Sequence, residues 1–244
     1  MDKYVLIVAG GKGLRMGGDL PKQFIPMRGK PLLMHTLEAF HRWDASARII
    51  LVLPEDHQPY WNMLCKEIGC KVPHAIVKGG DTRFFSVKNG LDWLLAERRR
   101  KGEEDSGLSL VAVHDGVRPF VSPEVVEACF DKAAVTGAVI PVVPMIDSLR
   151  ETDEKGSHPV DRSRYMAVQT PQVFLLELLT KAYEQPYSSL FTDDASVVEA
   201  MGHAIDTVPG DRENIKITTP FDLLIAEAMF ARQTLKTHRR YAGP

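Results

Sequence analysis

Tyr4-Val5-Leu6-Ile7-Val8-Ala9-Gly10-Gly11-Lys12-Gly13-Leu14-Arg15-Met16 is the most informative stretch of this sequence of 244 residues, and it lies near the start of the chain. Residues 4–8 are a continuous apolar run that ends in glycines, which is typical of a parallel strand buried on both faces. In open α/β sheets, ligands bind beyond the carboxyl ends of the strands. Small residues there let backbone N–H groups approach phosphate oxygens, so the glycine loop is the first candidate binding site.

Short apolar runs alternate with helical patterns along the rest of the chain. We expect strands at 48–53, 75–77, 108–113, 138–143 and 214–217. We expect helices that begin at Pro31 and that span about 86–98, 123–134, 175–183, 195–201 and 219–235. This alternation predicts an α/β fold with a mostly parallel central sheet and helices on both faces, in one domain over residues 1–244.

Two polar stretches interrupt this alternation. Residues 98–106 are rich in charge and are expected to form a solvated loop. Residues 147–164 are polar and lack a helical period. A long insertion of that kind in a compact fold is usually functional or disordered.

The composition argues against several classes of partner. A formal net charge of −2 provides no excess positive charge for nucleic acid or for an anionic membrane surface. No apolar run approaches the roughly 18 residues that span a bilayer. Cys65, Cys70 and Cys129 are an odd number without a CxxC pair, so we expect free thiols in a reducing compartment. The expected location is the cytoplasm, with neither nucleic acid nor a membrane as partner.

The glycine loop matches neither of the common nucleotide fingerprints. No GK[ST] sequence closes a Walker A pattern, and Met16 stands where a dinucleotide fingerprint has its third small residue. However, Arg15 and Lys22 lie seven residues apart, and Pro21 restricts the backbone just before the lysine. Nucleotidyl transfer needs cations fixed beside the reacting phosphorus, so this spacing favours a nucleotide site over two unrelated surface cations.

Five further motifs follow the loop and its Pro21-Lys22-Gln23-Phe24 extension. They are residues 79–87, 114–120, 169–172, 192–196 and 214–218. In this order, and over most of the chain, the motifs resemble those of the 2-C-methyl-D-erythritol 4-phosphate cytidylyltransferases of isoprenoid biosynthesis. The resemblance implies a Rossmann-like three-layer nucleotidyltransferase fold with a protruding β-arm. It also implies a reaction in which CMP passes from CTP to the methylerythritol phosphate and pyrophosphate is released.

The resemblance assigns roles to individual residues. It implies catalytic roles for Arg15, Lys22 and Lys216, which would stabilise charge on the reacting phosphates. Binding of CTP would fall to Ala9, Gly10, Gly11, Gly13, Gly80, Asp81, Ser86 and Gly116, with residues 80, 81 and 86 reading the cytosine. Asp115 would lie near both substrates and bind Mg²⁺ or another divalent cation, and Arg118 would contact the acceptor phosphate.

The polar segment matches the arm through which the family forms homodimers, here about residues 147–168. Through this arm, Arg162 would reach the acceptor phosphate in the partner subunit, and Ser148 would also contact the acceptor. The family often has Thr at the position of Ser148, and it usually has Ala at the positions of Gly10 and Gly116. These changes remove no polar group.

The residues alone leave other interpretations open. Ser86 could equally be the N-cap of the following helix. Asp115 could be a turn residue and Arg118 a surface arginine. Lys216, between Ile215 and Ile217 on an expected strand, would more often face solvent. We assign no catalytic role to His114, which a packed strand end also explains.

Two other functions compete with the favoured one. A ribitol 5-phosphate cytidylyltransferase often carries the Ala-Gly-Gly of residues 9–11, although residues 83–87 resemble the methylerythritol enzymes better. A non-catalytic CTP sensor could keep the fold, but it would not need Arg15, Lys22 and Asp115 together.

Overall fold

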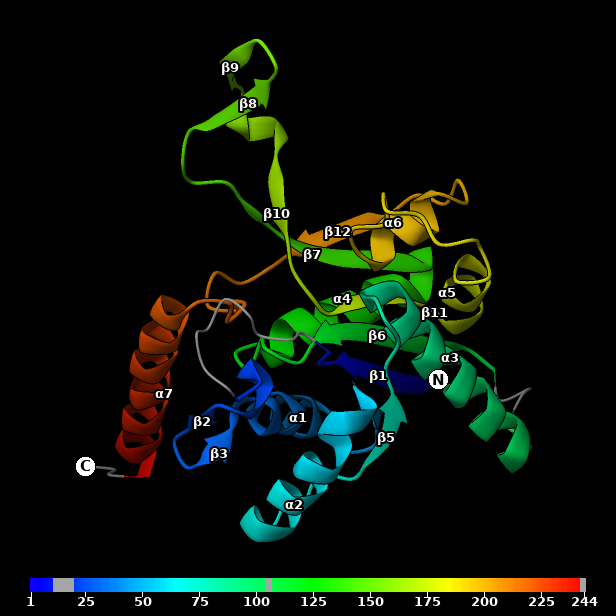
Figure 1. The fold of residues 1–244 in the computed structure, drawn as a ribbon, viewed down its shortest axis with the longest axis vertical. Coiled ribbons are helices and arrows are strands. Elements are labelled where there is room, and N and C mark those ends of the chain that lie inside the picture. Colours follow the sequence, from blue (N-terminus) through cyan, green and yellow to red (C-terminus); the bar gives the residue numbers. More distant parts are fainter. Residues whose placement is uncertain (11–19, 104–106, 242–244) are drawn as a thin grey trace.

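A computed structural model describes residues 1–10, 20–103 and 107–241, with side chains as far as Arg232. Its central sheet contains four neighbouring parallel strands, in the order β6 (Ser109–Asp115), β1 (Asp2–Val8), β4 (Arg48–Leu53) and β5 (His74–Lys78) (Figure 1). Beyond β6 the sheet continues through the antiparallel strand β11 (Gln172–Leu175) to β7 (Ala138–Pro144). β7 also pairs with β10 (Met166–Val168) in antiparallel and with β12 (Asp206–Pro209) in parallel orientation.

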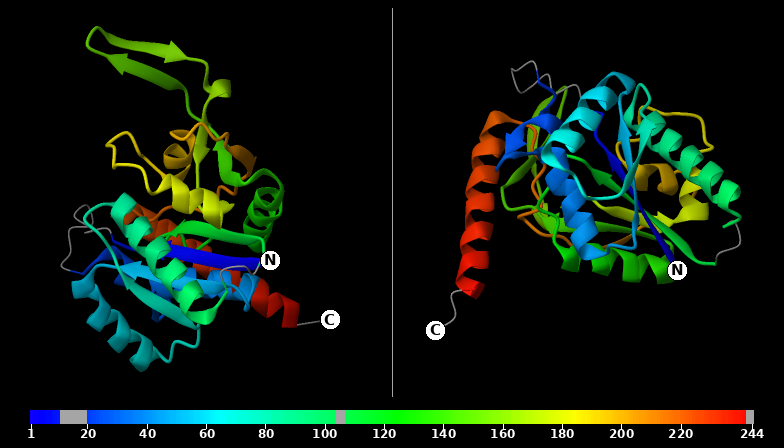
Figure 2. Two further views of the ribbon diagram at one scale, coloured as in Figure 1. Left: turned by 90° about the vertical axis from the view of Figure 1, so that its right-hand side faces the viewer. Right: turned by 90° about the horizontal axis from the view of Figure 1, so that it is seen from below.

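Helices cover both faces of the sheet, as the alternation predicted (Figure 2). One face carries α1 (Leu32–Trp43), α2 (Gln58–Ile68) and α4 (Pro123–Thr136), and the other carries α3 (Arg83–Lys101), α5 (Leu176–Ala182) and α6 (Asp194–Glu199). Side chains of β1 alternate between these two layers, with Val5 and Ile7 in the first and Tyr4 and Leu6 in the second. All four side chains are fully buried, so the first strand joins two cores.

A third apolar cluster fixes the end of the chain. Ala226 and Phe230 of α7 (Pro220–Tyr241) pack with Leu32, Phe120 and Ile217. Asp222, in the first turn of α7, accepts hydrogen bonds from the backbone N–H groups of residues 218 and 219. The helix therefore holds down the segment that immediately precedes it.

The polar segment expected to be an insertion is a hairpin that stands away from the rest of the protein (Figure 1). Strands β8 (Leu149–Asp153) and β9 (Gly156–Val160) pair in antiparallel orientation, and the short 3₁₀ turn Arg162–Arg164 follows. This hairpin lies where the resemblance implied a protruding β-arm. We call residues 147–168 the arm.

Several sequence expectations about elements are wrong. Residues 214–217 are not a strand, although the N–H of Ile217 donates to the carbonyl of Val117. Four elements, α2, β10, β11 and β12, form where we expected none. Of the residues of α2, only Trp61 is fully buried, which explains the weak apolar period.

The expectation of a solvated loop over residues 98–106 is wrong for Arg98. It lies within α3 and is 5% exposed. Its guanidinium donates to the hydroxyl of Tyr4 and to Oγ of Ser109, both at 2.8 Å, and to the carbonyl of Glu103, also at 2.8 Å. A charged side chain in this position links the last turns of α3 to the first residues of β1 and β6.

Replacing Arg98 with methionine is expected to lower the free energy of unfolding by about 3 kcal/mol, because buried partners lose their charged donor. Urea unfolding followed by circular dichroism measures the change. Arg100→Met is the matched control, since Arg100 is exposed and pairs with Glu97 on the surface of the same helix. Equal unfolding midpoints for the two variants would contradict a structural role for Arg98.

Candidate active site

A cavity of about 240 Å³ opens beyond the carboxyl ends of β1 and β6, where the sheet topology predicted a site. It is lined by Val8, Ala9, Gly10, Lys22, Gln23, Gly80, Asp81, Thr82, Arg83, Ser86, Asp115, Val117 and Lys216. The chain thus brings four separate motifs to one place. Eight of the residues singled out from sequence are among those that line it.

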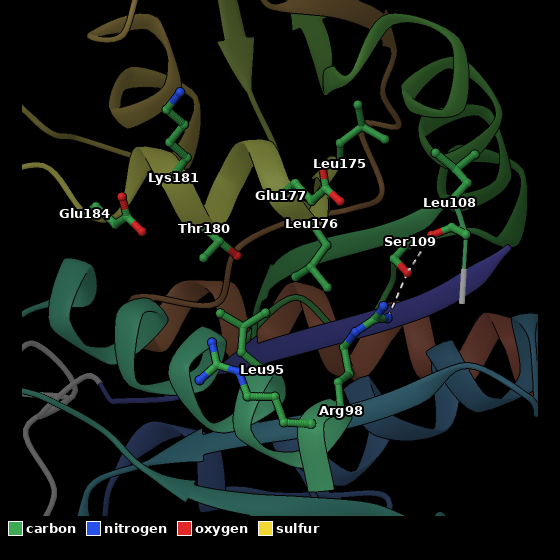
Figure 3. Close-up of a pocket in the computed structure, with 12 residues that line it drawn as sticks. Leu95, Arg98, Leu108, Ser109, Leu175, Leu176, Glu177, Thr180, Lys181 and Glu184 are labelled. Carbon is green, nitrogen blue, oxygen red and sulfur yellow. Dashed lines mark hydrogen bonds between the residues drawn. The ribbon is translucent and has the colours of Figure 1, made fainter. Parts of the chain in front are cut away.

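A larger cavity, of about 890 Å³, lies between the C-terminal half of α3 and α5 (Figure 3). Its lining includes Leu95, Leu108 and Leu176, and the Arg98 side chain in it bonds to Ser109. Arg98 is already hydrogen-bonded to Tyr4 of β1 and to Ser109 of β6. We place the candidate site in the smaller cavity because charged side chains from different elements converge there.

Asp115 is the electrostatic centre of the candidate site. Its carboxylate faces three cations: Lys216 Nζ at 3.0 Å, Arg118 Nε at 3.4 Å and Arg83 Nε at 3.9 Å. Burial would raise the pKa of Asp115, but Lys216, Arg83 and Arg118 outweigh it and hold this pKa well below its usual range. Asp115 is therefore a buried carboxylate that stays ionised.

Neighbouring residues fix the backbone around Asp115. The N–H of Asp115 donates to Oγ1 of Thr170, at 3.1 Å, and Thr170 bonds in turn to Nδ1 of His114. Nε2 of His114 lies 3.0 Å from the carbonyl of Arg118, which can only accept. His114 must therefore donate from Nε2 and accept at Nδ1, and this neutral form ties Arg118 to the end of β6.

Burial lowers the pKa of His114 to about 4, from its ordinary value of 6.5. Because the folded-state pKa lies below the unfolded one, the associated stability is complete above pH 6.5 and is lost as the pH falls towards 4. With about 1.4 kcal/mol per pH unit, the loss over this window is about 3 kcal/mol. We expect His114→Gln to flatten the fall in unfolding free energy between pH 6.5 and pH 4.

Urea unfolding at several pH values measures both slopes. Burial also lowers the pKa values of His35 and His74, but those residues are common to both proteins. The difference between the slopes therefore isolates His114. Parallel slopes would contradict the assignment of a buried, neutral imidazole.

The segment expected to read cytosine is held by its own hydrogen bonds. Thr82, not Ser86, is the N-cap of α3, and its side chain accepts from the N–H of Phe85. Ser86 lies in the first turn, where its hydroxyl accepts from the N–H of Gly80 at 3.1 Å and donates to the carbonyl of Thr82 at 2.9 Å. A Cβ at Gly80 would lie 2.4 Å from Cβ of Phe85, so only glycine fits there.

The glycine positions differ in how closely they are packed. A Cβ on Gly10 would meet Ser86 Oγ at 3.9 Å, an ordinary contact. A Cβ on Gly116 would lie 2.8 Å from Cβ of Ala9 and 3.0 Å from Leu33. The N–H of Gly116 donates to the carbonyl of Val8, which joins the ends of β6 and β1.

Several expected site residues lie elsewhere. Arg15, Gly11 and Gly13 are outside the described residues. Ser148 and Arg162 lie exposed on the arm, where the guanidinium of Arg162 bonds to the carbonyl of Ile146, and they do not line the cavity of their own chain. Arg118 contacts Asp115 but does not line the cavity, and Lys216 lines it from a segment that is not a strand.

Neither Arg83 nor Asp194 has a role that was predicted from sequence, although both belong to the surroundings of the site. Arg83 lines the cavity, and its two terminal nitrogens donate to the two carboxylate oxygens of Asp194 at 2.8 and 2.6 Å. Arg83 and Asp194 are 111 positions apart in the sequence and belong to different motifs. Each residue lies in a motif that resembles the family, but the sequence does not indicate that the two residues form a pair.

The described residues contain no group of three or more His, Cys, Asp or Glu side chains that could hold a metal ion. Asp115 and Asp81 are the carboxylates that line the cavity. Mg²⁺ in nucleotide sites is usually bound by one or two carboxylates and by substrate phosphates. This donor set fits a cation that arrives with a triphosphate.

In the described part of the chain, no helix has the length and apolar character needed to cross a membrane.

Comparison with known proteins identifies relatives over almost the whole chain. Residues 4–232 match the family model of 2-C-methyl-D-erythritol 4-phosphate cytidylyltransferase. The proteins of that name from Bacteroides fragilis and Porphyromonas gingivalis are 56% and 52% identical, over 94% and 93% of this chain and 100% and 97% of theirs.

Solved structures agree with the sequence matches. The 4-diphosphocytidyl-2C-methyl-D-erythritol synthase of Anaerococcus prevotii superposes with a TM-score of 0.75 at 28% identity, covering 94% of this chain and 96% of that one. The 2-C-methyl-D-erythritol 4-phosphate cytidylyltransferase of Thermus thermophilus gives 0.69 at 32% identity, covering 94% and 98%.

Proposed function

Because the chain belongs to the 2-C-methyl-D-erythritol 4-phosphate cytidylyltransferase family, we propose that its cavity transfers CMP from CTP to 2-C-methyl-D-erythritol 4-phosphate. Pyrophosphate is the second product, and the reaction belongs to isoprenoid biosynthesis. The observation that carries the proposal is the convergence of Lys22, Lys216 and Asp115 on a cavity that Ala9, Gly10 and the Gly80 segment also line.

The chemistry needs alignment and charge compensation more than proton transfer. The acceptor phosphate is already ionised at neutral pH, so its oxygen attacks the α-phosphorus of CTP in line without a general base. Negative charge then increases on the α-phosphate. Lys22 and Lys216 stabilise this charge, together with Arg15 of the glycine loop. Gly80, Asp81 and Ser86 hold the cytosine, and Ala9, Gly10, Gly11, Gly13 and Gly116 hold the phosphates.

A divalent cation, Mg²⁺ in our proposal, completes the charge balance. When bound, it neutralises part of the triphosphate charge and favours departure of pyrophosphate. Asp115 and the phosphates of CTP would hold it. Asp115 and Arg118 also face the acceptor and fix its phosphate for attack.

A direct assay tests the function. Pyrophosphate release from CTP is measured with 2-C-methyl-D-erythritol 4-phosphate and, in parallel, with ribitol 5-phosphate. We expect a higher kcat/KM with the methylerythritol acceptor. Faster turnover of ribitol 5-phosphate, or CTP binding without release with either acceptor, would contradict the proposal.

The Gly80 segment offers a specific test of cytosine binding. Gly80→Ala is expected to raise KM for CTP by about tenfold or more, since the new methyl group meets the backbone of Phe85 at 2.9 Å and displaces the segment. Gly10→Ala is the matched control, because its methyl group has room. Steady-state kinetics with varied CTP give both values, and an equal KM in the two variants would refute this role of Gly80.

We further propose that the enzyme is a homodimer joined through the arm. The base of the arm exposes Ile146, Tyr165, Met166 and Val168, each by more than 40% of its surface. Apolar side chains grouped in this way favour burial in a protein interface. In such a dimer the partner subunit's Arg162 contacts the acceptor phosphate, with Ser148 beside it.

Subunit mixing tests a contribution from the partner. Lys22→Ala and Arg162→Ala are each expected to be nearly inactive. If Arg162 acts across the interface, mixing and refolding the two variants creates heterodimers with one intact site. About a quarter of wild-type activity should then return, since half of the dimers carry one active site of two. No recovery despite heterodimer formation would exclude action in trans.

We place the protein in the cytoplasm. The support is that Cys65, Cys70 and Cys129 are all free. Cell fractionation with an antibody against the chain checks this location.

A further inference from the structure

Asp194 is a fully buried carboxylate that the proposed reaction does not use. It receives two hydrogen bonds from Arg83, and the hydroxyl of Tyr183 donates to its Oδ1 at 2.6 Å. Burying an ion pair costs stability that apolar side chains would not cost. Such a pair next to a site is a candidate for a functional role.

Arg83 connects this carboxylate to the site. It is the first residue of α3, its side chain is 30% exposed, and it lines the cavity. While its terminal nitrogens bind Asp194, its Nε lies 3.9 Å from Oδ1 of Asp115. One guanidinium thus lies between carboxylates from α6 and from the end of β6.

The three cations around Asp115 are not equally anchored. Lys216 has a side chain that is 43% exposed, and Arg118 donates to the neutral carbonyl of Asn214 at 2.7 Å. Arg83 is held by a carboxylate through two charged hydrogen bonds, which fix both its position and its plane. Among the residues that the structure describes, Arg83 is therefore the one of the three whose guanidinium is held by a second carboxylate.

We propose that Asp194 and Arg83 are positioning residues for the transfer. Asp194 holds the Arg83 guanidinium in place, and Arg83 keeps the carboxylate of Asp115 oriented while Lys216 and Arg118 turn towards phosphate. The inference rests on the proposed function, which gives the site its two phosphate-bearing substrates. It adds two residues to the proposed site and gives the three cations different roles. Arg83 orients Asp115, whereas Lys216 and Arg118 contact substrate phosphates.

This role should affect turnover more than CTP binding. The cytosine segment is held by Ser86 and Thr82, whose hydrogen bonds do not involve Asp194. Loss of the pair misaligns Asp115 instead, and a small displacement of a catalytic group lowers rates strongly. We therefore expect Asp194→Asn to lower kcat about 10- to 100-fold and to leave KM for CTP within about threefold.

The matched control is Asp92→Asn, the same change on the exposed face of α3. Asp92 forms a surface ion pair with Lys88 on the same helix, at 3.6 Å, and it does not line the cavity. Its kcat should remain close to that of the wild type. The double variant Arg83→Gln/Asp194→Asn should be no slower than the slower of its two single variants, because the residues act as one unit.

If Asp194→Asn does not fold, the variant Arg83→Lys tests the same role. Lysine keeps the charge but cannot contact both oxygens of Asp194 and still reach Asp115. It should lower kcat about tenfold at an unchanged KM for CTP. Thermal melting of each variant verifies that the protein is folded.

Three results would overturn the inference. They are wild-type kcat in Arg83→Lys, a rise in KM for CTP at constant kcat, and losses in kcat that multiply in the double variant. Inactive wild-type protein would instead refute the proposed function, so the two failures can be told apart.

Discussion

Replacing either lysine of the cavity, Lys22 or Lys216, with alanine is expected to lower kcat about 10²- to 10³-fold, by analogy with removal of one preorganised donor from a transition-state site. The effect should fall on kcat because charge on the α-phosphate increases during the reaction. CTP carries other phosphates and a cytosine that the remaining contacts still bind, so its KM should change less.

Pyrophosphate release under saturating CTP and acceptor measures this effect. Lys66→Ala is the control, since Lys66 is exposed on α2 and does not line the cavity. A lysine variant that keeps wild-type kcat and loses only CTP affinity would show that the residue binds the ground state and the transition state equally, and this would contradict its catalytic role.

Asp115→Asn is expected to have two large effects. The substitution leaves Lys216, Arg118 and Arg83 facing each other without their shared carboxylate. Breaking a buried ionic cluster in this way typically costs about 3–5 kcal/mol, which corresponds to a Tm about 6–20 °C lower. We also expect kcat to fall by about 10²-fold or more, since both substrates lose their common point of alignment.

Thermal melting with and without pyrophosphate tests the electrostatic cause. An added anion can take the place of the lost carboxylate, so pyrophosphate should raise the Tm of the variant by more than that of the wild type. Asp131→Asn, on the exposed side of α4, should behave like the wild type. Equal pyrophosphate shifts in all three proteins would contradict the proposed charge cluster.

The parts of the fold that sequence predicted well are those with a strong local pattern. A short continuous apolar run that ends in glycines, such as residues 4–8, is typical of a strand buried on two faces, and the position of the cavity follows from where such strands end. Weak patterns failed. α2 buries little besides Trp61, and the alternation of apolar and polar residues at 215–217 occurs in a segment that is not a strand.

Features that depend on distant contacts could not be predicted from one sequence. Arg98 belongs to a run of four basic residues and differs from its neighbours only because Tyr4 and Ser109 lie opposite it. Likewise, nothing in the local pattern of Asp194 indicates a bond to a residue 111 positions earlier. By contrast, Lys22, Asp115 and Lys216 were predicted together because each belongs to a motif with its own family signature.

The packing of α7 has a consequence for protein synthesis. Phe230 and Ala226 form a single cluster with Ile217, the residue after Lys216, and with Leu32 near the start of the chain. A nascent chain can build the central sheet early, because β1, β4, β5 and β6 all precede residue 116. It cannot fix Lys216 until α7 has left the ribosome. We therefore expect ribosome-bound chains that lack the last helix to be folded in their core and unable to turn over CTP.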